Sequence, residues 1–140
     1  MPNVPGDGQL PFTCRLWTRW SDEDNQHVLN NAVYLTLFEE ARHRFFSGSD
    51  LLTDGSFPFL LAASHLRFLA PGRGGVEVTV RMGTTHIGRS SFEQAYRVFG
   101  PEGNAWCEGS ALLVCYDAAS GKSRPMDEVF RSGLERLAQG

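Results

Sequence analysis

Hydrophobic and polar side chains alternate near the start of the chain. Every second residue from Phe12 to Ser21 falls on one face. That face would carry Phe12, Cys14, Leu16, Thr18 and Trp20. A period of two is typical of a β-strand with one buried side. The pattern therefore predicts a strand at 12–21, which leads directly into a polar stretch.

Over residues 32–46 the spacing of apolar positions changes to three and four, which is the pattern of an amphipathic helix. The apolar members are Tyr34, Leu37, Phe38, Ala41 and Phe45, and the more polar side carries Glu39, Glu40, Arg42 and Arg44. Asp and Asn dominate residues 22–31, and we expect Asn30 or Asn31 to cap this helix. Gly48 follows its last turn and should end it.

Four further strand-like runs follow, at 57–69, 76–82, 91–99 and 106–116, after a loop that contains Asp54-Gly55. No second long helix interrupts them, and residues 100–104 favour a tight reversal, so the sheet should be largely antiparallel. Residues 118–123 should leave the sheet. Pro125 then suits the first position of a short C-terminal helix at 126–137.

These elements predict an α+β fold in which an antiparallel five-stranded sheet wraps around one long central helix. An open sheet has edge strands, and an exposed edge is a template for pairing with another chain. We therefore expect the protein to associate with itself, as a homodimer or as a dimer of dimers.

Composition narrows the function classes. The 140 residues are 41% hydrophobic, which fits one globular domain over 1–140, with residues 1–11 expected to form a flexible extension. Lys and Arg number 13 against 16 Asp and Glu, so no broad basic surface is available for nucleic acid. No apolar run is long enough for a membrane helix, and residues 1–10 do not resemble a signal peptide.

Three cysteines, Cys14, Cys107 and Cys115, are odd in number and lack metal-ligand spacing. We interpret them as buried thiols in a reducing compartment, which favours a cytoplasmic location. The histidines likewise lack the HExxH or Cys/His spacing of a zinc site, so we expect no metal.

Candidate chemistry is concentrated at residues 19–42. Asp22, Glu23 and Asp24 stand next to one another a few residues before the predicted helix. One interpretation is a solvated loop that complements the positive end of the helix. The other is that one carboxylate works beside unpaired backbone N–H groups that stabilise an oxyanion, which is the combination that acyl hydrolysis needs.

The stretch from Trp20 to Arg42 resembles the hot-dog fold acyl-CoA thioesterases of the 4-hydroxybenzoyl-CoA thioesterase type. Members have an aromatic residue, an Asp-x-Asp motif, Gly-His-Val-Asn-Asn or a near variant, and a helix with Tyr and Glu-x-Ala-Arg. The resemblance extends to residues 65–71, 88–92 and 111–125, and it covers nearly all of the chain from Phe12 to Leu134. It implies a hot-dog fold and hydrolysis of an acyl thioester, with coenzyme A as part of the substrate and no separate cofactor.

By this resemblance Asp24 is the carboxylate that attacks the thioester carbonyl or activates a water molecule. The backbone N–H that polarises the thioester oxygen belongs to Asn31, so the side chain of Asn31 should matter little. The phosphates of coenzyme A would bind at Arg89, Ser90 and Ser91. The planar guanidinium of Arg89 and the two serine hydroxyls are suitable hydrogen-bond donors for phosphate. Arg124 is a weaker candidate for the same role. Trp20 and His27 complete the substrate-binding residues that the resemblance implies.

The chain departs from the family pattern at His27-Val28-Leu29, where relatives have Gly-His-Val. Glycine is common where the backbone needs a positive φ, so either His27 adopts that conformation or the loop follows another path. His27 could also act as an acid–base group. We expect the acyl group to lie in an apolar slot near Phe57, Phe59 and Ser64, although aromatic residues at strand spacing are more often plain core.

Three alternatives remain open at this stage. The substrate could be a carrier-protein thioester, or the domain could bind or sense acyl-CoA without hydrolysing it, because a fold does not determine function. A hot-dog dehydratase would use a His-plus-acid pair on the helix, for which His43 is poorly placed.

Overall fold

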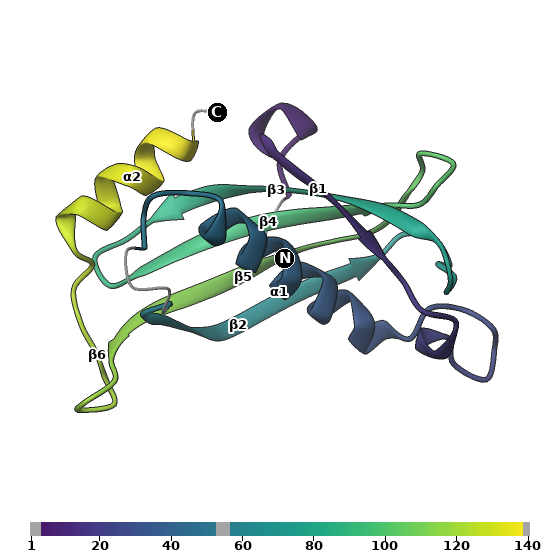
Figure 1. Cartoon of the computed structure of the whole chain (residues 1–140), viewed down its shortest axis with the longest axis horizontal. Helices are drawn as coiled ribbons and strands as arrows, with labels where there is room; N and C mark the ends of the chain where they lie inside the picture. The colour runs from purple at the N-terminus through teal and green to yellow at the C-terminus, as the bar shows by residue number, and fades with distance from the viewer. Residues whose placement is uncertain (1–3, 53–56, 139–140) are drawn as a thin grey trace.

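One long helix lies against a curled antiparallel sheet in the computed structural model of the chain, which describes residues 4–52 and 57–138 (Figure 1). The elements are η1 (Asp7–Gln9), β1 (Phe12–Trp17), η2 (Trp20–Asp22), α1 (Asn31–Ser47), β2 (Phe59–Phe68), β3 (Glu77–Ile87), β4 (Ser91–Phe99), β5 (Ala105–Asp117), β6 (Lys122–Ser123) and α2 (Glu128–Ala138). The strand order is β1-β3-β4-β5-β2, with β6 paired to β5. The predicted fold class is confirmed; the predicted loop at Asp54-Gly55 lies outside the described residues.

The core forms between α1 and the inner face of the sheet. The five apolar helix positions that the sequence predicts are all buried, and so are Val78, Val80 and Met82 on β3. Arg42 differs from its predicted place on the polar side, since it is only 6% exposed. Its Nη1 donates to the Tyr96 hydroxyl at 2.9 Å, and that hydroxyl donates to Gln94 at 2.9 Å. The Arg42 guanidinium is tolerated in the core because Tyr96 and Gln94, both on β4, form this chain of hydrogen bonds with it.

The first strand is shorter than the sequence predicts. It ends at Trp17, and Trp20 lies in η2 with 82% of its surface exposed rather than on the inner face. The chain leaves the sheet because Asp22 caps the following turn, where its carboxylate accepts the Arg19 N–H at 2.8 Å.

Residues 118–121 leave the sheet in a turn, as predicted, but Lys122 and Ser123 differ from the prediction because they return to it. Gly121 has a φ of 70°, a left-handed conformation that glycine adopts without strain. The chain therefore turns back, and Lys122 and Ser123 pair with Asp117 and Tyr116 as β6.

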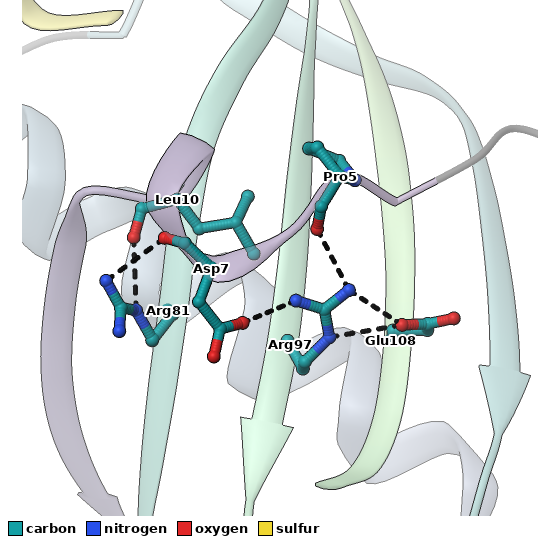
Figure 2. Close-up of polar contacts among 6 residues, drawn as sticks. All are labelled: Pro5, Asp7, Leu10, Arg81, Arg97 and Glu108. Carbon is teal, nitrogen blue, oxygen red and sulfur yellow. Dashed lines mark hydrogen bonds and ion pairs between the residues drawn. The ribbon is translucent and has the colours of Figure 1, made fainter. Parts of the chain in front are cut away.

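The N-terminal segment crosses the outer face of the sheet, as Figure 2 shows. Arg97 donates to the Pro5 carbonyl at 3.0 Å and to the Asp7 carboxylate at 2.5 Å, and it also pairs with Glu108 at 3.0 Å. Arg81 donates to the carbonyls of Asp7 and Leu10 at 3.1 and 3.2 Å. These contacts hold residues 5–10 against the sheet, and the predicted flexibility of residues 1–11 stays a prediction.

The Arg97→Gln variant measures how strongly this segment is held. Arg97 has 14% of its side chain exposed, so its charged hydrogen bonds are largely shielded from water. We expect the free energy of unfolding to fall by about 1–3 kcal/mol in urea titrations. Arg15→Gln is the control, because the Arg15–Glu77 pair is exposed and 4.0 Å long and should contribute less than about 0.5 kcal/mol. Equal losses in the two variants would contradict the account.

Candidate functional site at the start of α1

Helix α1 begins where the sequence predicts its cap. The Asn30 side chain accepts the Ala32 N–H at 3.0 Å, so Asn30 is the cap and Asn31 is the first helical residue. The first N–H groups of a helix have no carbonyl to bond within the helix. The Asn31 N–H is one of these groups, and it lies at the positive end of the helix dipole.

Backbone hydrogen bonds connect the loop before the helix to this N-terminus. Glu23 and Leu29 form an antiparallel bridge, and the Asp24 N–H donates to the Val28 carbonyl at 2.9 Å. The Asp24 carboxylate accepts the Gln26 N–H at 2.8 Å, which forms a local turn. The half-buried Asp24 is therefore fixed on a short loop whose other strand leads directly into Asn30 and Asn31.

The three neighbouring acids have different surroundings. Both oxygens of Asp22 are engaged by Arg19, and Asp22 is 8% exposed. Burial alone would raise the pKa of Asp22, but the hydrogen bonds and charge of Arg19 outweigh it, so the pKa is lowered. Glu23 accepts the Gly74 N–H at 2.8 Å and thereby ties the loop to the segment before β3. The Asp24 carboxylate, by contrast, accepts the Gln26 N–H and is bonded neither to an arginine nor to another segment of the described residues.

His27 adopts the left-handed conformation, with a φ of 62°. It is the one non-glycine residue with a positive φ among those that the structure describes. His27 therefore adopts the positive φ, which is the first of the two alternatives that the sequence leaves open. Its side chain is exposed, and its role in binding stays a prediction.

The cost of this conformation can be measured with His27→Gly. A left-handed residue with a Cβ costs about 1–2 kcal/mol, whereas glycine adds about 0.4–1 kcal/mol of unfolded-state entropy. We expect a net gain of about 0.5–1 kcal/mol in the free energy of unfolding. His27→Ala keeps the Cβ and should show no gain. A His27→Gly protein less stable than His27→Ala would contradict the strain that we infer from the backbone.

A cleft of about 250 Å³ opens beside the start of α1. Its lining comes from the loop, the helix and the end of β2: Val28, Leu29, Asn31, Tyr34, Phe68, Leu69, Ala70, Pro71 and Gly72. Asp24 does not line the cleft. Its N–H, however, donates to the carbonyl of Val28, and Val28 does line the cleft. The cleft therefore lies beside Asn31, whose N–H is the predicted oxyanion donor. Sequence reasoning treated Tyr34 as core and missed that it lines this cleft.

The predicted phosphate-binding residues lie at the other end of the sheet. The Arg89 carbonyl accepts from Met126, the Ser90 carbonyl accepts from Cys115, and Arg124 donates to Cys115. These bonds bring the turn that contains Arg89, Ser90 and Ser91 close to Arg124. Arg124 also lines a larger cavity of about 640 Å³ with Phe57 and Pro58.

The two groups of predicted site residues are separated by the length of β3. Its 11 residues span about 33 Å, from the segment tied to Glu23 to the turn at Arg89. Figure 1 shows α2 and β6 at one end of the sheet, whereas α1 begins at the opposite end. Within one chain, Trp20, Asp24, His27 and Asn31 lie in the segment that leads into α1, whereas Arg89, Ser90, Ser91 and Arg124 lie at the other end of the sheet.

The three residues predicted to form the acyl slot have separate roles in the structure. Phe57 lines the larger cavity, whereas Phe59 is 7% exposed and lies 4.9 Å from Phe46 between ring centroids. Ser64 donates to the Ser110 carbonyl at 2.8 Å. No group of three or more metal-ligating side chains occurs within 4–52 and 57–138. No helix in those ranges is long and apolar enough to cross a membrane.

Comparison with known proteins finds one family model, described as the thioesterase-like superfamily, which matches residues 18–134. A thioesterase from Thermus thermophilus, solved with coenzyme A and Zn, is 31% identical, with a TM-score of 0.82 over 94% of this chain and 98% of that one. A 1,4-dihydroxy-2-naphthoyl-CoA thioesterase from Synechocystis is 20% identical, with a TM-score of 0.76 over 90% and 96%.

A Staphylococcus aureus protein solved with CoA is 14% identical to the chain, with a TM-score of 0.81 over 91% of this chain and 84% of that one. These two more distant likenesses show the fold alone. No curated protein matches the sequence.

Proposed function

Because the chain belongs to the thioesterase-like superfamily, we propose that it hydrolyses an acyl-coenzyme A thioester to the free acid and coenzyme A. The observation that carries the proposal is the position of Asp24. Its carboxylate stands on a short loop that is hydrogen-bonded directly into the N-terminus of α1, where the Asn31 N–H is the first helical donor. A carboxylate beside a ready oxyanion donor is the arrangement that acyl hydrolysis requires.

The proposed reaction starts with attack on the thioester carbonyl carbon, either by the Asp24 carboxylate or by a water molecule that Asp24 deprotonates. The carbonyl oxygen becomes an oxyanion and is stabilised by the Asn31 N–H. The C–S bond then breaks, and coenzyme A leaves as a thiolate that takes up a proton. On the nucleophilic route, water hydrolyses the resulting anhydride and restores the carboxylate. Either route consumes one water molecule, and neither needs a cofactor.

Asp24 is a better candidate than its two neighbours. Asp22 is engaged on both oxygens by Arg19 and serves the turn. Glu23 holds the N–H of Gly74 on a different segment. The resemblance to the 4-hydroxybenzoyl-CoA thioesterase type favours the same residue, since the second acid of the Asp-x-Asp motif is the reacting one there. The free thiols of Cys14, Cys107 and Cys115 suit a cytoplasmic enzyme.

A dimer formed through β2 would complete the site. β2 is an edge strand with exposed apolar residues at both ends: Leu60 at 55%, Leu61 at 45% and Phe68 at 48%. If two copies of β2 pair antiparallel, the Phe59 end of one strand lies beside the Phe68 end of the other. Phe68 lines the cleft at Asn31, and Pro58 lines the cavity at Arg124. Such pairing would bring Arg124 of one protomer toward Asp24 of its partner, although the two residues lie at opposite ends of the sheet within one chain.

The proposed function is tested by release of free thiol from a panel of aryl, short-chain and long-chain acyl-CoA thioesters. Turnover of at least one member supports the proposal and begins to name the acyl group. Silence across the panel, with acyl-CoA still raising the melting temperature, would contradict it. That result would favour a binding module. The same thiol-release assay with acyl-carrier-protein thioesters would then test whether the substrate is a carrier-protein thioester.

A further inference from the structure

Arg42 is a buried cation that the proposed reaction does not use. The residue is 6% exposed, and no acid forms an ion pair with it within residues 4–52 and 57–138. Taking a guanidinium out of water is costly, and apolar side chains of similar volume often replace buried ions without loss of stability. Stability alone therefore does not account for a charged residue at this position of α1.

A directed row of hydrogen bonds runs from Arg42 into the sheet. Arg42 Nη1 donates to the Tyr96 hydroxyl at 2.9 Å, and that hydroxyl donates to Gln94 Oε1 at 2.9 Å. Gln94 Nε2 then donates to the Thr84 hydroxyl on β3 at 3.1 Å. Burial raises the pKa of Tyr96 to about 12, although the charge and hydrogen bond of Arg42 act against it, so the hydroxyl keeps the proton that it donates. We call these four residues the polar row.

Tyr96 holds α1 through its ring as well as through its hydroxyl. The Phe38 ring stacks on the Tyr96 ring, with 4.6 Å between centroids and 11° between planes. The backbone of β5 also lies against Phe38, because a Cβ at Gly109 would stand 2.8 Å from the Phe38 ring. Phe38 and Arg42 are one turn apart and share one helix face. Tyr96 therefore contacts α1 at two points, and both points are buried.

The polar row depends more strongly on the position of α1 than the apolar contacts around it do. Contacts such as those of Leu37, Ala41 and Phe45 are not directional, so they tolerate a small shift of α1 along the sheet. A hydrogen bond weakens steeply when its angle changes, and a broken one would leave polar atoms buried without partners. The row is complete, since the described chain has no enclosed side-chain polar atom without a partner. It therefore favours one register of α1.

The register of α1 determines where the proposed oxyanion donor lies. Asn31 is the first residue of the same helix, about three turns before Arg42. A packed helix moves as a rigid element, so a shift at Arg42 is carried to the Asn31 N–H. Asp24 is held by a separate route, because the neighbouring Glu23 accepts the Gly74 N–H at 2.8 Å on the segment before β3. A shift of α1 would therefore change the distance between the Asp24 carboxylate and the Asn31 N–H.

We propose that Arg42 and Tyr96 are positioning residues whose hydrogen bond fixes the register of α1 on the sheet and so holds the Asn31 N–H where the oxyanion forms. The inference rests on the proposed thioesterase function and deepens it. Neither residue touches the substrate. A misplacement of about 1 Å can cost about a hundredfold in rate. Loss of the row should act on kcat rather than on KM, because it disturbs a contact that strengthens in the transition state.

The test replaces the row by apolar side chains in the triple variant Arg42→Met, Tyr96→Phe, Gln94→Met. We expect this protein to stay folded, with kcat lowered at least about tenfold and KM within about threefold of the wild type. The matched control is Arg97→Gln, which changes the next residue of β4 on the opposite face of the sheet and should lower stability but not kcat. A triple variant that keeps the wild-type kcat would overturn the inference.

A double-mutant cycle with Asn31→Pro tests whether the row acts through the backbone N–H. That donor is absent in Asn31→Pro, so adding the triple variant should lower kcat by less than about twofold further. Equal losses in the two backgrounds would show that the row acts elsewhere, and they would overturn the inference. If the triple variant does not fold, Tyr96→Phe takes its place in every measurement, because it breaks the row by removing a single oxygen atom.

A readout without substrate separates this inference from the proposed function. The amide resonance of Asn31, measured by NMR, should shift in the triple variant and stay in place in Arg97→Gln. The Asn31 amide lies about 16 Å along the helix from Arg42, so the substitutions do not reach it directly. An unchanged resonance would overturn the inference whatever the turnover. If the wild type hydrolyses no thioester, the proposed function fails, whereas a shifted resonance would still support the role of the row in placing Asn31.

Discussion

Asp24→Asn is expected to lower kcat by at least about a hundredfold while leaving the protein folded. An amide is neither a nucleophile nor a base, and a positioned general base contributes about 10²–10⁴ in rate. The fold should survive because the Asp24 side chain accepts the Gln26 N–H, a bond that an Asn oxygen can also make. The measurement is thiol release at saturating substrate, together with thermal unfolding.

Glu23→Gln is the matched control for this variant. It neutralises the adjacent carboxylate, and the amide oxygen of Gln can still accept the Gly74 N–H. We expect it to keep most of the wild-type kcat. A Glu23→Gln protein that loses turnover while Asp24→Asn retains it would show that the wrong carboxylate has been assigned.

Asn31→Pro is expected to lower kcat by about 10²–10³, the usual effect of removing one oxyanion donor. Proline has no backbone N–H, so this substitution deletes the proposed donor itself. The helix should tolerate it, because proline is favoured at the first helical position. Asn30 has a φ of −59° and a ψ of 134°, a backbone conformation compatible with a following proline. The unfolding midpoint is therefore expected to stay close to that of the wild type.

Asn31→Ala separates the backbone from the side chain. It keeps the N–H and removes only an exposed amide, so it should retain most of the turnover. Single-turnover rates of thiol release for the two variants check this difference. Loss of turnover in Asn31→Ala that matches the loss in Asn31→Pro would move the catalytic role to the side chain of Asn31.

The regular elements of the fold could be predicted because hydrophobic periodicity reports directly on burial. The three-and-four spacing from Tyr34 to Phe45 and the alternation at Val78, Val80 and Met82 both mark residues that are buried. Trp20 was misplaced because it continues the alternation of β1. The strand ends earlier, where the Asp22 carboxylate turns the chain, and periodicity does not record such a side-chain cap.

The site could be predicted only in part. Side chains close together in sequence, such as Asp24 and Asn31, lie on one loop and helix start, so a motif describes them well. The cleft depends on Phe68 and Gly72, which reach Tyr34 through tertiary packing. The separation of Arg89 from Asp24 likewise follows from the path of β3 across the sheet and not from any local pattern.

The central claim is that the loop and helix start at Asp24 hydrolyse a thioester. Its most direct test is thiol release by wild type, Asp24→Asn and Asn31→Pro, assayed side by side on the best acyl-CoA of the panel with equal amounts of folded protein. The account predicts steady release by the wild type and at least about a hundredfold less by each variant. Equal release by all three proteins would contradict it.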